Sequence, residues 1–161
     1  MNTSIRQMAD RDIETVLRII RAHDAFDGEC ADRDLRGYPG DPARRRSPHE
    51  AYFVAVDDDS GEVIGVSGYF TDRYRTPGIF WLGWTYVDER FRRRGAGSAL
   101  LRHVVQQVRE KGARKLYIDT GSAPSYQAAV ALYQRFGFAV EGQLKDYYGD
   151  GEDFLILGRR I

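Results

Sequence analysis

The chain has 161 residues, of which 42% are hydrophobic and 30% are charged, an ordinary balance for a folded globular domain. Its 24 lysine and arginine residues equal its 24 aspartate and glutamate residues, which argues against a nucleic-acid-binding surface over the whole molecule. One cysteine, Cys30, excludes an internal disulfide, and no apolar stretch has membrane-spanning length, so we expect a cytoplasmic protein without a nucleic-acid or membrane partner.

The first third of the chain predicts one strand, one helix and a long segment without a clear period. A short strand is expected at residues 4–8. The helix that follows has one apolar face, formed by Ile13, Val16, Leu17 and Ile20. Between Asp24 and Glu50 the apolar content falls, and glycines and prolines interrupt any long element. We therefore expect a loop or short irregular helices in that segment.

The middle of the chain predicts three strands. Residues 52–56 and 62–70 are expected to form a β-hairpin, because the acidic, glycine-containing stretch Asp57–Gly61 between them is typical of a turn. An apolar strand rich in aromatic residues is expected at residues 79–87. It contains Gly83, and a glycine inside a strand is compatible with a local distortion of the sheet.

The stretch Arg92–Gly97, Arg-Arg-Arg-Gly-Ala-Gly, lies between that strand and an amphipathic helix pattern. The first amides of a helix have no internal partner and the helix dipole is positive there, so such a turn attracts anions. Gly95 and Gly97 carry no side chain, which lets an anion approach the backbone, and the arginines add positive charge. The sequence therefore predicts a phosphate-binding turn; the alternative is a solvated basic turn.

Two common nucleotide-binding motifs do not fit this turn. A Walker loop needs a Gly-Lys-Ser/Thr ending, which is missing here. A dinucleotide-binding loop needs a third glycine at the position of Leu100. A nucleotide-binding domain is therefore disfavoured.

The last third of the chain continues the alternation of strands and helices. We expect a strand at residues 115–120, a helix that ends at Gly137, an extended segment at 138–148 and a last strand at 154–157. Together these elements indicate one α/β domain over residues 1–161, built on a mixed sheet. The helix after the phosphate-binding turn should join two parallel strands of that sheet.

Two motifs in this order resemble the GNAT superfamily of N-acetyltransferases. Arg92–Gly97 is similar to the loop that grips the pyrophosphate of coenzyme A, and Ala129–Phe138 is similar to a signature on a later helix. The tail Tyr147–Asp153, with a tyrosine pair and an acidic pair, is similar to that of bacterial ribosomal-protein alanine acetyltransferases. The resemblance implies a single-domain GNAT fold, with a mixed central β-sheet of about six to seven strands flanked by helices.

The reaction that the resemblance implies is transfer of an acetyl group from acetyl-CoA to an amine, by direct attack in a ternary complex and without a metal. The acceptor is expected to be a protein or peptide amine, or a small-molecule amine. The residues expected to hold coenzyme A are Val87, Arg92, Arg93, Arg94, Gly95, Ala96, Gly97, Ser98, Tyr126 and Tyr133. Tyr126 departs from the family pattern, which often has an asparagine there to hold the pantetheine arm.

Three catalytic roles follow from the resemblance. The backbone N–H of Val87, near the end of the central strand, is expected to polarise the acetyl carbonyl. Asp119 is expected to take a proton from the acceptor amine, with Glu89 as the competing carboxylate and a structural cap as its alternative role. Tyr133 is expected to protonate the departing thiolate, although a tyrosine on an apolar helix face can also be a core residue.

The acceptor side of the site is expected to include Trp84, Tyr147 and Tyr148, with packing on the sheet as the alternative for the two tyrosines. The resemblance also places the irregular segment before the hairpin over the acceptor; a mobile surface loop is the alternative. His103 is expected to face solvent, and the histidines show no metal-ligand spacing. The competing functional class is a coenzyme A-binding sensor or regulatory module without turnover. The chain is expected to be a monomer or a homodimer.

Overall fold

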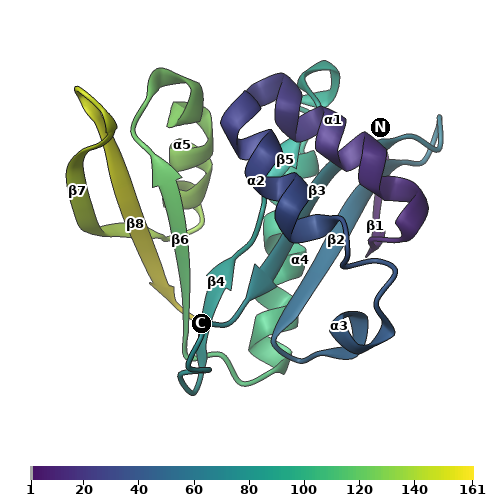
Figure 1. Ribbon diagram of the computed structural model, residues 1–161, viewed down its shortest axis with the longest axis horizontal. Coiled ribbons are helices and arrows are strands. Elements are labelled where there is room, and N and C mark those ends of the chain that lie inside the picture. Colours follow the sequence, from purple (N-terminus) through teal and green to yellow (C-terminus); the bar gives the residue numbers. More distant parts are fainter. Residues whose placement is uncertain (1) are drawn as a thin grey trace.

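The computed structural model describes residues 2–161 and arranges them as a mixed sheet between two layers of helices (Figure 1). The strands are β1 (Thr3–Gln7), β2 (Glu50–Asp57), β3 (Val63–Phe70), β4 (Ile79–Leu82), β5 (Tyr86–Val87), β6 (Lys115–Gly121), β7 (Ala139–Gly149) and β8 (Glu152–Arg160). The α-helices are α1 (Ile13–His23), α2 (Ala25–Leu35), α3 (Pro42–Arg46), α4 (Ala96–Glu110) and α5 (Gln127–Arg135). Short 3₁₀ turns cover Asp10–Asp12, Glu89–Phe91 and Pro124–Tyr126.

The sheet has the strand order β1-β2-β3-β4-β6-β8-β7, and β5 pairs with β3 beside β4. Within residues 2–161 it contains eight strands, slightly more than the six to seven expected, and the strand expected at 79–87 is divided into β4 and β5. Strands β4 and β6 are parallel and flank α4 in the chain, as predicted, whereas the other pairs are antiparallel.

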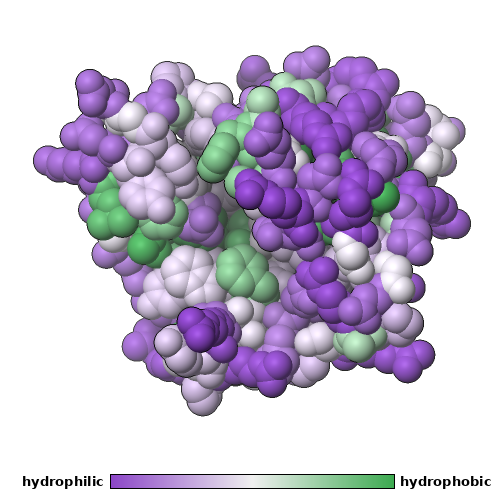
Figure 2. Space-filling model, viewed as in Figure 1, coloured by the Kyte–Doolittle hydropathy of each residue, from purple (hydrophilic) through white to green (hydrophobic). Residues whose placement is uncertain are grey.

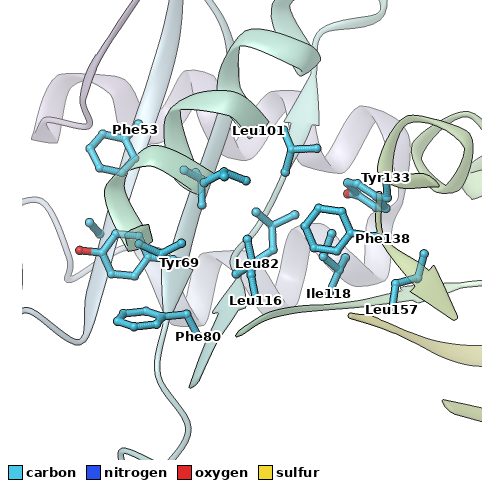
Figure 3. Packing of buried hydrophobic residues seen from close by; sticks show 14 residues of the cluster. Phe53, Tyr69, Phe80, Leu82, Leu101, Leu116, Ile118, Tyr133, Phe138 and Leu157 are labelled. Carbon is cyan, nitrogen blue, oxygen red and sulfur yellow. The ribbon is translucent and has the colours of Figure 1, made fainter. Parts of the chain in front are cut away.

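The residues of β2 alternate between two hydrophobic clusters, one on each face of the sheet. Tyr52 and Val54 pack with α1 and α2, whereas Ala51 and Phe53 pack with α4. This is the period of two expected of a strand that is covered on both faces. Figure 3 shows the cluster on the α4 face of the sheet, which extends from Phe53 on β2 to Tyr133 on α5. One continuous core therefore supports the strands on both sides of β4.

The segment expected to be irregular contains a regular helix, so that prediction was wrong for α2. The Asp24 carboxylate caps its start by accepting from the Asp27 N–H at 2.9 Å. The sequence signal is weak because the buried face of α2 consists of Gly28, Ala31 and Leu35, two of which are small. A Cβ on Gly28 would lie 2.2 Å from Cγ of Arg21, so glycine here allows α2 to pack closely against α1.

His103 is half-buried and faces solvent only in part, so the expectation of a solvent-facing side chain was too simple. Its ring lies edge-on to Phe53, with 4.5 Å between the ring centroids. Its Nε2 atom is buried and has no hydrogen-bond partner within residues 2–161. The position follows three residues after the fully buried Leu100, and therefore lies at the edge of the buried face of α4.

Candidate active site

The two halves of the sheet separate beside β4. Strands β4 and β6 pair only through Ile79–Trp81 and Lys115–Tyr117, and beyond these residues they diverge (Figure 1). A cleft of about 1210 Å³ opens there, lined by residues from α1, α2, β5, the start of α4, β6 and α5. Figure 2 shows the surface hollowed between the β7–β8 side and the α1–α2 side. The divergence brings chain segments that are far apart in the sequence to one cavity.

The interruption of the central strand is a β-bulge. The Gly83 N–H donates to the Gly68 carbonyl at 2.8 Å, and the next pair along is Tyr86 with Val66. Between these two pairs the β4–β5 segment advances three residues, from Gly83 to Tyr86, whereas β3 advances two, from Gly68 to Val66. The β4–β5 segment therefore contains one extra residue, which defines a bulge. The ring of Tyr52 passes across this point, and a Cβ on either glycine would lie less than 3 Å from it. The two glycines therefore make room for Tyr52 beneath the bulge.

The backbone of Val87 faces the cleft. Its neighbour Asp88 donates its N–H to the Ile64 carbonyl at 2.9 Å, and Val87 itself is opposite Gly65. Because alternate residues of an antiparallel strand direct their N–H and C=O groups away from the partner strand, those of Val87 point to the side from which β6 has diverged. Arg92 Nε donates to this carbonyl at 3.2 Å. The N–H of Val87 can therefore donate to a ligand in the cleft.

In the predicted phosphate-binding turn, Arg92–Gly97, the two positions occupied by glycine differ in what they require of the residue. Gly95 precedes α4 with φ of 94°, and Arg93 has φ of 62°, so the turn uses the left-handed conformation twice. Gly97 lies within the first turn of α4, where a Cβ would make ordinary contacts at 3.4 Å with Leu132 Cδ2 and at 3.7 Å with Val87 Cγ2. The protein itself does not require glycine at this position. The missing side chain leaves room for a ligand against the helix amides.

Most of the residues expected to hold coenzyme A line the cleft: Val87, Arg92, Arg93, Gly95, Gly97, Ser98, Tyr126 and Tyr133. Arg94 does not line it; its guanidinium lies over the Phe91 ring, 5.7 Å from the centroid. The side chain of Ala96 is also outside the cleft, since it is buried at the base of α4. Only the backbone amide of Ala96, among the first of the helix, can face an anion.

Tyr133 and Asp119 line the cleft from neighbouring elements, α5 and β6. Tyr133 is 5% exposed, and its hydroxyl makes no hydrogen bond to another protein group within residues 2–161. Burial, together with the negative charge of Asp119, raises the pKa of Tyr133, which therefore keeps its proton at neutral pH. Burial and the charge of Asp27 raise the pKa of Asp119, although solvent still reaches this carboxylate through the open cleft. Glu89, the competing carboxylate, is exposed outside the cleft.

Two of the three aromatic residues expected on the acceptor side line the cleft. Trp84 donates its indole N–H to Asp34 at 3.1 Å, and Tyr148 faces Asp119 from β7. Burial and the charges of Asp119 and Asp27 raise the pKa of Tyr148 to about 12. Tyr147 lies outside the cleft, where its ring contacts that of Tyr148 edge-on at 5.0 Å.

The sequence did not reveal that Asp27 joins the two walls of the cleft. Its carboxylate accepts hydrogen bonds from the hydroxyls of Tyr86 on β5 and Tyr126 before α5. The ring of His23 lies edge-on to both tyrosines, at 5.2 and 5.3 Å. Burial and the charge of Arg92 lower the pKa of His23, so the neutral ring can accept the Arg92 hydrogen bond at Nδ1. No local pattern marks Asp27, because its partners lie 59 and 99 residues away.

Asp27→Ala is expected to loosen α2 and to lower the free energy of unfolding by about 1–3 kcal/mol, since two partly buried hydroxyls lose a charged acceptor. Hydrogen exchange of the α2 amides and chemical denaturation would measure both effects. Asp32→Ala on the same helix is the matched control, because Asp32 pairs only with two exposed arginines, Arg21 of α1 and Arg36 just after α2. Equal effects of the two substitutions would contradict the role given to Asp27.

Within residues 2–161, none of the helices combines the length and the apolar character needed to cross a lipid bilayer. Within the same residues, no three histidine, cysteine, aspartate or glutamate side chains gather in a way that could hold a metal ion.

Comparison with known proteins finds the same family by sequence and by structure. The sequence pattern of the acetyltransferase (GNAT) family matches residues 14–138. An N-alpha-acetyltransferase of Sulfurisphaera tokodaii is 32% identical over 116 residues, which cover 66% of this chain and 67% of the relative. The [ribosomal protein bS18]-alanine N-acetyltransferase of Escherichia coli is 35% identical over 78 residues, which cover 47% of this chain and 51% of the relative. A crystal structure of a GNAT-family acetyltransferase from Desulfovibrio desulfuricans superposes with a TM-score of 0.85, at 25% identity and 99% coverage of both chains.

Proposed function

The chain belongs to the acetyltransferase (GNAT) family, whose members transfer an acetyl group from acetyl-CoA to an amine, and from this premise we propose that its acceptor is the α-amine at a peptide or protein N-terminus. The names of the relatives support this acceptor class, since those from Sulfurisphaera tokodaii and Escherichia coli acetylate α-amines or an alanine of a ribosomal protein. The single observation that supports acetyl transfer at this site is that the phosphate-binding turn, the Val87 amide, Asp119 and Tyr133 share one cleft.

The roles proposed for these groups follow from their positions. The amides at the start of α4, together with Arg92 and Arg93, hold the diphosphate of acetyl-CoA. The Val87 N–H donates to the acetyl oxygen as negative charge develops there. Asp119 accepts a proton from the acceptor amine, whose nitrogen forms a bond to the carbonyl carbon. As the carbon–sulfur bond breaks, Tyr133 donates its proton to the sulfur.

The acceptor side of the cleft supports binding of a cationic group. Asp27, Asp34, Asp119 and Glu152 line it, together with the aromatic rings of Trp84 and Tyr148. Carboxylates in a partly enclosed cavity attract a protonated amine, and the aromatic faces favour a cation as well. An α-amine has the lowest pKa of the common biological amines, about 7.7–8.0, so it loses its proton to a base most readily.

A panel of acceptors tests this acceptor class. Release of free thiol from acetyl-CoA would be measured with a peptide that has a free N-terminus, with the same peptide blocked at the N-terminus but containing lysine, and with a polyamine. We expect turnover with the free N-terminus and almost none with the other two. Faster turnover of the polyamine or of the lysine peptide would contradict the acceptor. Binding of acetyl-CoA without turnover of any amine would instead favour the non-catalytic module.

We also propose that the protein acts in the cytoplasm, as a monomer or a homodimer. The one cysteine, Cys30, is a free thiol of intermediate exposure, which suits a reducing compartment. Acetyl-CoA and a protein N-terminus are the only partners that the proposed reaction needs.

A further inference from the structure

A second hollow, shallow and of about 710 Å³, lies on the outer face of α4 and is dominated by arginines. Its charged lining consists of Arg102, Arg109, Arg135 and Arg159. No carboxylate lines it, and none of the four guanidinium groups is within ion-pair distance of a carboxylate in residues 2–161. Elsewhere arginines such as Arg44 and Arg90 are paired with nearby carboxylates. The hollow therefore carries positive charge that the protein does not neutralise.

This hollow borders the cleft where α4 and α5 are neighbours. Arg135 lines both cavities. The two helices touch near the start of α4, where a Cβ on Gly97 would lie 3.4 Å from Leu132. They remain neighbours further along, because the Arg102 guanidinium lies 6.0 Å from the centre of the Phe136 ring. A ligand held at the phosphate-binding turn can thus extend toward the arginines on the side where α4 and α5 are neighbours.

Helical spacing places Arg102 and Arg135 at the near end of the hollow. Ser98 lines the cleft, and Arg102 is one turn further on the same face of α4. Gly97 and Arg102 are separated by about 7.5 Å along the helix axis, a distance that a flexible arginine side chain shortens. Arg109 is two further turns away, about 10.5 Å beyond Arg102. Among the four arginines of the hollow, Arg102 is therefore nearer to the phosphate-binding turn along α4 than Arg109, and Arg135 is the one that also lines the cleft.

We propose that Arg102 and Arg135 form a binding site for the 3′-phosphate of coenzyme A. The inference rests on the proposed function, because it takes the diphosphate of coenzyme A to lie at the phosphate-binding turn. The 3′-phosphate is carried by the same ribose that bears the 5′-diphosphate, so it lies only a few bonds from the turn. A phosphate monoester has a charge of about −1.5 to −2 at neutral pH, and guanidinium groups bind it through paired hydrogen bonds.

The test compares coenzyme A with 3′-dephospho-coenzyme A, which differ only in this phosphate. Dissociation constants would be measured by calorimetry for the unaltered protein, for the double variant Arg102→Gln/Arg135→Gln and for Arg109→Gln. We expect the unaltered protein to bind coenzyme A about tenfold tighter than the dephospho form. In the double variant this preference should disappear, with the affinity for the dephospho form unchanged. Arg109→Gln should keep the preference, since at physiological salt a charge so distant is largely screened.

The outcomes separate this site from the proposed function. Equal binding of both ligands by the unaltered protein would overturn the 3′-phosphate site and leave the coenzyme A-binding turn in place. A preference that persists in the double variant would overturn the choice of Arg102 and Arg135. Failure of the unaltered protein to bind either ligand would overturn both proposals. Unchanged affinity for the dephospho form in the double variant also demonstrates that this variant is folded.

Discussion

Gly97→Asp is expected to abolish binding of coenzyme A while the protein stays folded. A Cβ at this position meets only ordinary contacts with Leu132 and Val87, so the fold has space for a side chain. An acidic side chain in the first turn moreover stabilises a helix, because the helix dipole is positive at that end. The carboxylate would nevertheless occupy the place of a phosphate and repel it. Loss of two charge-assisted hydrogen bonds, at about 1.5 kcal/mol or more each, already corresponds to a weakening of about 100-fold.

Calorimetric titration with coenzyme A measures this effect, and thermal unfolding of the same variant reports on the fold. Gly97→Ala is the matched control, because it adds the Cβ without the charge. We expect the alanine variant to bind coenzyme A more weakly than the unaltered protein and far more tightly than the aspartate variant. If Gly97→Asp bound coenzyme A with unchanged affinity, the diphosphate could not lie against the start of α4, and the proposed site would be wrong.

The elements that could be predicted from the sequence have local signals. The apolar periodicity of α1 and α4 and the turn between β2 and β3 lie within short stretches, and the structure confirms these elements close to the expected boundaries. The parallel pairing of β4 and β6 also follows from a general rule about connections through a helix. In these regions each residue's neighbours in the chain are sufficient to determine its conformation.

Elements that depend on distant partners could not be predicted in the same way. Helix α2 has a buried face of small residues, so its apolar pattern is weak although Leu35 and Ala31 are completely buried. The bulge between β4 and β5 lies against Tyr52, which belongs to another strand and whose ring occupies the space that a Cβ on Gly83 would take. The bridge at Asp27 likewise joins hydroxyl groups that lie 59 and 99 residues away in the chain. Local propensity contains no information about such contacts.

In the candidate site, too, the residues that belong to a contiguous motif were predicted better than those whose direction depends on the fold. The phosphate-binding turn and Tyr133 lie in contiguous motifs, and the structure brings them to the same cleft. Arg94, expected as part of the basic turn, and Tyr147, expected as part of the tyrosine pair of the tail, lie outside it. Neighbouring residues in a turn or strand point in different directions, so adjacency in the chain does not imply a shared cavity. Their exclusion leaves Arg92, Arg93 and Tyr148 as the side chains to test first.

Tyr133→Phe is expected to lower kcat by about 100-fold or more and to leave the affinity for coenzyme A unchanged. The substitution removes only a hydroxyl that makes no hydrogen bond to protein within residues 2–161, so the packing around the ring is retained. A hydroxyl held in the cleft without a protein partner is available to a ligand. The high pKa of Tyr133 ensures that the proton is present at neutral pH.

Transfer of that proton to the departing sulfur is unfavourable in water by about 2 kcal/mol, because a phenol has a pKa near 10 and a thiol near 8.5. Burial raises the pKa of the thiol as well as that of Tyr133, so the difference need not grow inside the cleft. Single-turnover kinetics separate the chemical step from product release, and the expected loss lies in the chemical step. A variant that keeps full turnover in this measurement would remove Tyr133 from the mechanism and leave it as a core residue beside Phe138.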